Sequence, residues 1–166
     1  DPYRGMTLAD INGDDHLDVI TPNPRSISIQ LGDGTGTFSP ASPLESGNVP
    51  PFNTTVADFN GDSIPDIAAG SGEGPGRLMV WFGKSGGTFE PAGNTPLVIA
   101  KGPTRLKAKD INDDGFDDIL VTSYLGDEVA VATGGTEKFQ ITRIKLNNNQ
   151  WDVAAGDLDQ NGRTYL

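Results

Sequence analysis

Short hydrophobic runs recur along the chain, separated by polar stretches that are rich in glycine. Three stretches alternate between polar and apolar residues, which is typical of β-strands. They are SISIQLG at 26–32, RLMVWFG at 77–83 and EVAVATG at 128–134. No window keeps the 3.6-residue period of an amphipathic helix. The pattern therefore predicts an all-β protein.

A nine-residue polar motif recurs at nearly constant spacing. Its copies begin at Asp10, Asp58, Asp110 and Asp157, which are 48, 52 and 47 residues apart. A short apolar run precedes each copy, and each of the first three leads into an apolar run, an alternating strand and a glycine-rich turn ending in Phe. Each unit thus holds about four short antiparallel strands, the number in a β-propeller blade.

We therefore predict a single repeat domain over residues 1–166, with three full blades and the start of a fourth. The approximate units are 1–48, 49–100, 101–147 and an incomplete 148–166. One sheet cannot bury both of its faces alone, and stacking against the next sheet does so. Closed propellers have about 4–8 blades. We expect the chain to be part of a larger propeller, or to need another copy or chain to cover its open ends.

Composition excludes several classes of function. The chain has a net charge of −11, which argues against nucleic acid or an anionic membrane as its partner. No stretch approaches the roughly 18 apolar residues of a membrane helix. The sequence contains no cysteine, so thiolate chemistry and a disulfide framework are impossible. The chain starts at Asp1 instead of Met, as expected of a mature product or a fragment.

The repeated motif places oxygen-bearing side chains at its first, third, fifth and ninth positions. Such hard ligands suit calcium, which also accepts a backbone carbonyl, here near the seventh position. Of the 23 acidic residues, 14 lie inside the four motif copies, as a metal loop requires. The alternative is that Asp, Asn and Gly only make hairpin turns. Three copies with the same oxygen positions favour the metal.

The motif differs from the helix–loop–helix calcium loop. That loop needs a glutamate at position 12, where this chain has Thr21, Ala69 and Val121. We expect the ninth-position Asp to close the site instead. This residue stands at the start of the following strand, so one ion would connect the end of one strand to the beginning of the next.

The motif, the strand after it and the GTF turn recur in that order, and they resemble FG-GAP or VCBS repeats. These repeats build integrin α-subunit heads and many secreted bacterial and fungal proteins. The resemblance covers essentially the whole chain and implies a calcium-containing β-propeller, most often seven-bladed. It also implies a secreted or cell-surface protein that acts in adhesion or ligand binding.

Carried over by position, the resemblance implies three calcium sites. Asp15 and Ser63 stand where the family prefers glycine, so we expect slight strain in the first two loops. The seventh-position residues, which would offer only their carbonyls, are His16, Ile64 and Phe116. The side-chain ligands are Asp10, Asn12, Asp14 and Asp18; Asp58, Asn60, Asp62 and Asp66; and Asp110, Asn112, Asp114 and Asp118.

The fourth copy is incomplete as a ligand set. Asp157, Asp159 and Asn161 fit the pattern, but Tyr165 occupies the closing position. A phenol is a poor calcium ligand, because calcium prefers carboxylate, carbonyl and water oxygens. A fourth site would need a ligand from elsewhere.

Catalytic residues are scarce, and we expect no enzyme activity. The one histidine, His16, lies inside the first loop, so a Ser/His/Asp triad would dismantle that loop. The clustered aspartates are assigned to ion loops, where a bound cation keeps them ionised and unfit as general acids. No acid with a raised pKa in an apolar pocket is evident.

Two functions remain from the sequence. The chain is a module whose protein or glycan ligand docks on loops at one face of the propeller, or it is a non-catalytic scaffold of a larger secreted enzyme or self-assembling surface structure. Aromatic residues could line a binding surface. We expect Trp81 and Trp151 to pack between blades instead. The loop at Tyr124 is a better candidate for exposure.

Overall fold

The computed structural model of the chain describes residues 5–72, 75–99, 101–147, 152–157, 159 and 164–165. Its named elements are all β-strands, and they form three antiparallel sheets. The first sheet contains β1 (Thr7–Ala9), β2 (Asp18–Pro22), β3 (Ser26–Gln30) and β4 (Ser42–Glu45). The second contains β5 (Asn53–Ala57), β6 (Asp66–Ser71), β7 (Arg77–Lys84), β8 (Thr88–Pro91) and β9 (Leu97–Val98). The third contains β10 (Pro103–Lys109), β11 (Asp118–Ser123), β12 (Glu128–Thr133) and β13 (Gln140–Lys145).

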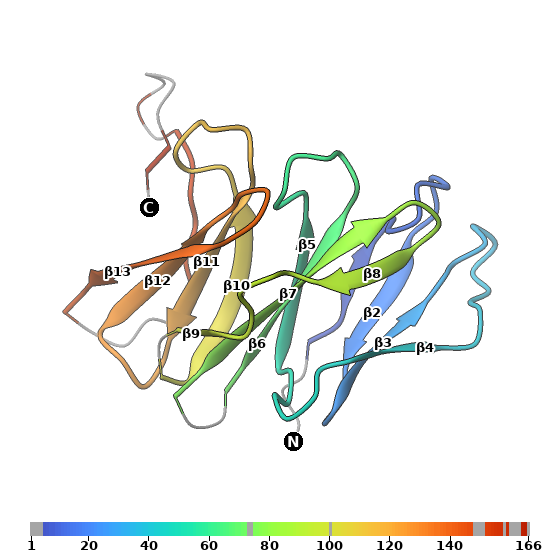
Figure 1. Cartoon of the computed structure of the whole chain (residues 1–166), viewed down its shortest axis with the longest axis horizontal. Helices are drawn as coiled ribbons and strands as arrows, with labels where there is room; N and C mark the ends of the chain where they lie inside the picture. Colours follow the sequence, from blue (N-terminus) through green and yellow to red (C-terminus); the bar gives the residue numbers. More distant parts are fainter. Residues whose placement is uncertain are drawn as a thin grey trace.

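Each sheet contains a meander of four strands that pair in sequence order, and the second sheet has a fifth, short strand, β9. The three sheets stand side by side, and over the described residues they do not close into a ring (Figure 1). This arrangement is that of three consecutive blades of a β-propeller, and it confirms the predicted fold class. The three alternating stretches of the sequence form β3, β7 and β12, the third strand of each blade.

The second sheet differs from the prediction by one strand. Both β8 and β9 pair with β7, β8 along residues 81–84 and β9 along residues 77–78. The two short strands therefore act as one outer strand that is interrupted between Pro91 and Leu97. Pro96 lies in this interruption and has no N–H to donate to a strand ladder.

The core lies between the sheets. Ile20, Ile27 and Ile67 belong to the cluster between the first and second sheets, together with Trp81, which is 1% exposed. Trp81 thus packs between blades, as predicted. Phe59, Leu78 and the other residues of the largest cluster fill the space between the second and third sheets.

Burial along the second strand of each blade shows which sheets are covered on both faces. Strands β6 and β11 are buried at every position. Strand β2 instead alternates between buried and half-buried residues. The alternation arises because, among the described residues, only one face of the first sheet is covered by another sheet.

The phenylalanine that ends each glycine-rich turn shows the same effect. Phe139 is 4% exposed and lies with its ring centroid 6.3 Å from that of Phe59 in the preceding blade. Phe38, its counterpart in the first blade, is 43% exposed. The first blade thus presents an apolar side chain that its counterparts bury against a neighbour.

The beginning of the fourth unit packs on the third sheet. Val153 and Ala155 lie against Leu120, Val129 and Val131 on the face of that sheet away from the second blade. In the described part of this unit the apolar run at 153–155 forms no strand, and Gly156 forms an isolated bridge with Tyr165. Trp151 lies outside the described residues.

Candidate metal-binding loops

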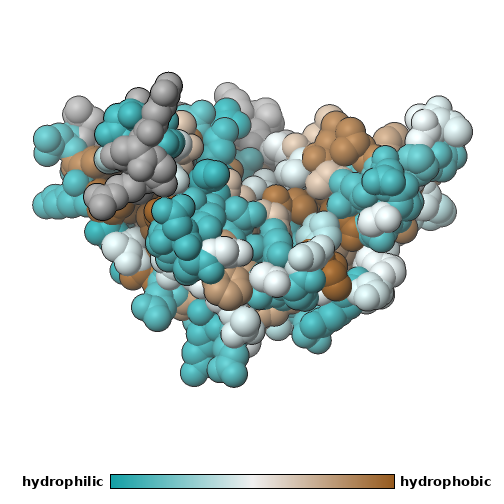
Figure 2. All heavy atoms as spheres, turned by 90° about the horizontal axis from the view of Figure 1, so that it is seen from above, coloured by the Kyte–Doolittle hydropathy of each residue, from teal (hydrophilic) through white to brown (hydrophobic). Residues whose placement is uncertain are grey.

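The three complete motifs form equivalent loops at one edge of the molecule. They connect β1 to β2, β5 to β6 and β10 to β11, and all three emerge at the top of Figure 1. Seen from that side, the surface is largely hydrophilic, with hydrophobic groups gathered toward the side of the first sheet (Figure 2). The stacking of blades in one orientation places these loops along a common rim.

The backbone of each loop takes left-handed conformations at its fourth and sixth positions. In the second loop these are Gly61, with φ of 76°, and Ser63, with φ of 64°. The first loop has Gly13 and Asp15 at these positions, and the third has Asp113 and Gly115, all with positive φ. A left-handed φ favours glycine, because a Cβ crowds the backbone there. Asp15, Ser63 and Asp113 therefore carry the strain of their loops.

The first-position aspartate organises the loop through backbone hydrogen bonds. Asp10 Oδ1 accepts from the N–H of Gly13 at 2.8 Å, and its Oδ2 accepts from the N–H of Asp15 at 2.8 Å. Burial would raise the pKa of Asp10, but the backbone N–H groups outweigh it and hold the pKa below its ordinary value. The pKa of Asp110 is lowered in the same way. Both carboxylates are therefore ionised at neutral pH.

The third and fifth positions face each other. In the first loop, Asn12 Oδ1 accepts from the N–H of Asp14 at 3.0 Å, while the Asn12 amide group donates to Asp14 Oδ2 at 2.9 Å. Asp14 Oδ1 accepts from the N–H of His16 at 2.9 Å. The second and third loops repeat these three bonds. One oxygen of each fifth-position aspartate thus points to the partner amide inside the loop.

The ninth-position aspartates Asp18, Asp66 and Asp118 are fully buried, each with 0% exposure. In the second loop, Asp66 Oδ2 accepts from the N–H of Phe59 at 2.9 Å, and Oδ1 accepts from the N–H of Gly83 at 2.7 Å. The other two make the equivalent pair of bonds. Each ninth-position side chain thus connects the start of its loop to the end of the third strand of its blade.

The carboxylates of one loop lie close enough to affect each other's ionisation. Burial raises the pKa of Asp66 to about 6, against two backbone hydrogen bonds, and repulsion from Asp62 and Asp58 contributes to the rise. The pKa of Asp118 is raised by burial and by its own loop partners, Asp114 and Asp110. In the second and third loops, the first- and fifth-position carboxylates thus add to the rise in the pKa of the ninth-position aspartate.

These donor sets fit a hard cation such as calcium. They consist of carboxylate and amide oxygens alone, and their mutual repulsion is what a bound cation removes. Over the described part of the chain, no three His, Cys, Asp or Glu side chains form a ready metal cage. Each carboxylate of these donor sets instead accepts hydrogen bonds from backbone N–H groups and is turned toward them. His16, Ile64 and Phe116 occupy the seventh positions, and their carbonyls remain predicted ligands.

Three glycines that the sequence analysis did not single out are necessary for this arrangement. A Cβ at Gly32, Gly83 or Gly134 would lie 2.3, 2.2 or 2.6 Å from the backbone oxygen of Leu17, Pro65 or Asp117, respectively. Only glycine permits this approach, which brings its N–H to the ninth-position carboxylate. The signal was present in the sequence, since the three glycines occupy the same place after the alternating strands.

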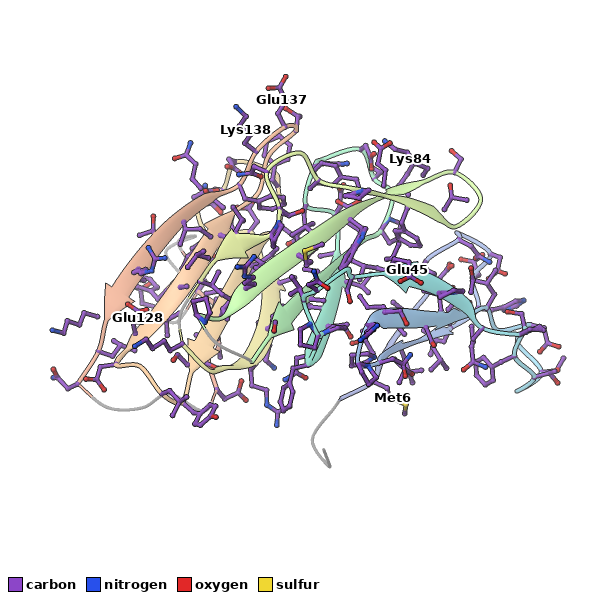
Figure 3. The ribbon with its side chains drawn as sticks, turned by 60° about the horizontal axis from the view of Figure 1, so that its bottom comes forward. Met6, Glu45, Lys84, Glu128, Glu137 and Lys138 are labelled. Atoms are coloured by element: carbon purple, nitrogen blue, oxygen red, sulfur yellow. The ribbon has the colours of Figure 1, made fainter. Side chains whose placement is uncertain are left out.

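A lysine follows the glycine at the end of the third strand in the second blade, beside the second loop. Lys84 is the last residue of β7 and directly follows Gly83 (Figure 3). Its Nζ lies 2.7 Å from Glu90 Oε1. The hydrogen bond to Glu90 raises the pKa of Lys84, and the charges of Glu90, Asp62 and Asp66 add to this. The first and third blades have Asp33 and Gly135 at this position. The second loop thus has a neighbouring positive charge.

The fourth motif is closed differently. Gly156 and Tyr165 exchange backbone hydrogen bonds of 3.0 and 2.8 Å. In the other three loops, too, the residue before the motif pairs with the ninth position. The Tyr165 hydroxyl donates to Asp159 Oδ2 at 3.3 Å. Asp157 also lies in the described part, whereas Asn161 lies outside it. The phenol thus points to a predicted ligand of this loop.

Stacked four-stranded blades with acidic loops on a common rim define the chain as a β-propeller-type repeat protein. A sequence model of the FG-GAP-like repeat matches residues 10–69, 58–121 and 110–166. The chain therefore belongs to the FG-GAP-like repeat family. Each match begins at the first Asp of a motif and extends into or beyond the next one. A search of curated proteins found no match.

Proposed function

We propose that the chain is a calcium-binding repeat module of an extracellular, secreted or cell-surface protein. The carrying observation is the buried Asp66 of the second loop, whose pKa burial raises to about 6, with repulsion from its loop partners Asp62 and Asp58 adding to the rise. A carboxylate buried among other carboxylates is costly unless a cation compensates the charge. The first and third loops have the same donors at the same positions.

In this proposal the ligands are those predicted from the sequence. Calcium, when bound, would supply the positive charge that the carboxylates lack. The first-position side chain would hold the loop backbone. The third- and fifth-position side chains would turn an oxygen inward, in place of the Asn–Asp bond seen here. The ninth-position side chain would connect the site to β3, β7 or β12, so that binding stiffens the blade.

The number of calcium ions bound tests the proposal. Calorimetric titration of the full chain should give three sites, and Asp62→Ala should remove one of them. Asp62 is exposed and accepts only local bonds, so its loss spares the core, whereas Asp66 is itself structural. Glu90→Ala is the matched control, because it removes a nearby charge outside the ligand set. Unchanged stoichiometry in Asp62→Ala would overturn the assignment.

We further propose that the module binds a protein or glycan ligand at one face of the propeller, in adhesion or ligand recognition. Exposed apolar side chains support a surface of this kind. Leu17 and Phe38 line a hollow of about 360 Å³ beside the first loop, together with His16. Tyr124 and Leu125 are exposed on the loop between β11 and β12, as predicted for this loop. A glycan array with and without chelator tests this role.

A structural scaffold is the second candidate function. The exposed Phe38 favours it, because its counterparts Phe89 and Phe139 pack toward the preceding blade. Further blades, a second copy or another chain would cover this face of the first sheet. Sedimentation measurements over a range of concentrations test the self-association, and ligand-free assembly would favour the scaffold.

We also propose that the chain carries no catalytic site of its own. The acidic residues of the loops are committed to backbone hydrogen bonds and to the proposed cation.

The described part of the chain has no helix of the length and apolarity needed to cross a membrane. The charge of −11 supports the exclusion of nucleic acid as a partner.

A further inference from the structure

We propose that the third loop positions the second, so that the two loops bind calcium cooperatively while the first loop binds independently. This inference rests on the proposed calcium binding and concerns how the sites influence one another. Phe116 and Asp117 of the third loop act as positioning residues for the second. They contact its backbone and supply no side-chain ligand to it.

Two backbone hydrogen bonds join the third blade to the second loop. The N–H of Asp117 donates to the carbonyl of Asp58 at 3.0 Å, and the N–H of Gly135 donates to the carbonyl of Phe59 at 2.9 Å. Asp58 is the first-position ligand of the second site, and Phe59 donates its N–H to the ninth-position Asp66. The third blade therefore holds the segment that connects two proposed ligands of the second site.

A side-chain contact strengthens this junction. The ring of Phe116 lies against Gly61, so that a Cβ at Gly61 would be 2.6 Å from the Phe116 Cε1 atom. Gly61 has φ of 76° and donates its N–H to Asp58 Oδ1 at 2.7 Å. Phe116 thus covers the turn that orients the Asp58 carboxylate. Its own N–H donates to Asp114, a proposed ligand of the third site.

The junction between the first and second loops lacks this arrangement. Pro65 stands where the third loop has Asp117, and proline has no N–H to donate to the first loop. A Cβ at Gly13, the counterpart of Gly61, would have no described atom within 4 Å. The second blade contacts the first loop at Gly87. A Cβ added at Gly87 would lie 3.3 Å from the Asn12 Cβ atom. That contact comes from a β-turn and not from the second loop.

Cooperativity follows from the shared backbone. Calcium binding at the third loop orders Asp114 to Asp118, which includes the groups that hold Asp58 and Gly61. The second loop then loses less conformational freedom when it binds, and its affinity rises. Linkage requires the same effect in the opposite direction. Among the described residues, no such shared segment connects the first loop to the second.

Amide NMR spectra of the full chain, recorded during a calcium titration, can follow each loop separately. The N–H signals of Gly13, Gly61 and Gly115 report the first, second and third loops. Asp114→Ala disables the third site, and we expect it to weaken calcium binding at Gly61 at least about fivefold, the lower end of ordinary coupling. Asp14→Ala disables the first site in the matched way and should leave the Gly61 midpoint unchanged.

Asp117→Pro tests the hydrogen bond itself. It gives the third loop the residue that the second loop already accommodates as Pro65, and it should reduce the effect of Asp114→Ala on the Gly61 midpoint. Asp117→Asn removes the same charge and keeps the N–H, so its coupling should persist. Should Asp117→Pro fold poorly, Phe116→Ala removes the ring contact and should reduce the coupling.

The outcomes separate this inference from the proposed function. If all three loops bind calcium and Asp114→Ala leaves the Gly61 midpoint unchanged, the coupling is absent and the calcium module stands. An equal effect of Asp14→Ala and Asp114→Ala on Gly61 would also overturn the specific link. If no loop responds to calcium, the proposed function fails, and the inference fails with it.

Discussion

Single residues in the loops show how one backbone shape is built from different side chains. The fourth and sixth positions take a left-handed φ in all three of the loops that the structure describes in full, yet glycine occupies one of the two positions in each of them. Asp15, Ser63 and Asp113 take the other place, where their Cβ atoms are crowded. The strain that the sequence predicted for Asp15 and Ser63 corresponds to φ values of 66° and 64°.

Replacing Ser63 by glycine should therefore stabilise the fold. Relief of the left-handed strain outweighs the greater chain entropy of glycine in the unfolded state, for a net gain of about 0.5–1 kcal/mol. Urea unfolding at fixed calcium concentration measures this change. Ser63→Ala keeps the Cβ and should give no gain, so equal stability of the two variants would contradict the strain.

Strands and loops are connected at the ends of β3, β7 and β12. There a glycine brings its N–H to the buried ninth-position carboxylate, which also holds the start of the loop. The loop that carries the proposed ligands is thus fixed to the third strand of its blade. The geometry at this joint is set by the close approach of two backbone segments.

Gly83→Ala should destabilise the second blade with or without calcium. The new Cβ would lie 2.2 Å from the Pro65 carbonyl oxygen, so backbone must move. We expect a loss of about 1–3 kcal/mol, the usual cost of overpacking, measured by urea unfolding in chelator.

Gly72→Ala is the control for this change. Its Cβ would be 3.9 Å from the nearest side-chain atom, in Phe52, and its φ is not left-handed. Its stability should change little. Similar stabilities of Gly83→Ala and Gly72→Ala would show that the close approach at the end of β7 is not required.

At the scale of the molecule, three similar sheets share two continuous cores. Neighbouring sheets supply both sides of each core, so that local order in one blade affects the next. The loops lie on one rim, and their charges add to the net charge of −11. A cation in each loop would both reduce this charge and stiffen each blade.

Chelation should accordingly lower the melting temperature. Extracellular sites with dissociation constants of about 10⁻⁴–10⁻³ M each contribute up to roughly 1.5 kcal/mol at millimolar calcium. Three such sites correspond to a shift of about 10 °C in a chain of this size. Calorimetric scans in calcium and in excess EGTA measure it, and magnesium at equal ionic strength is the control. Equal melting temperatures in calcium and EGTA would contradict the proposal.

The periodicity of the sequence was sufficient for the architecture. Alternation at 26–32, 77–83 and 128–134 gave the third strand of each blade, and the motif spacing gave the number of blades. These features are local, because side-chain direction alternates along every strand. The split of the outer strand into β8 and β9 was not predicted, since it depends on which parts of β7 remain free to pair.

The sequence by itself determined the blades, the order of the loops and the chemical type of their donors, because each depends on residues that lie close together in the chain. Tertiary structure alone decided that Asp66 is buried, that Gly83 must lack a Cβ and that Phe116 covers Gly61. Each of these depends on distances between segments that are far apart in the chain, and only the stacking of the sheets sets those distances.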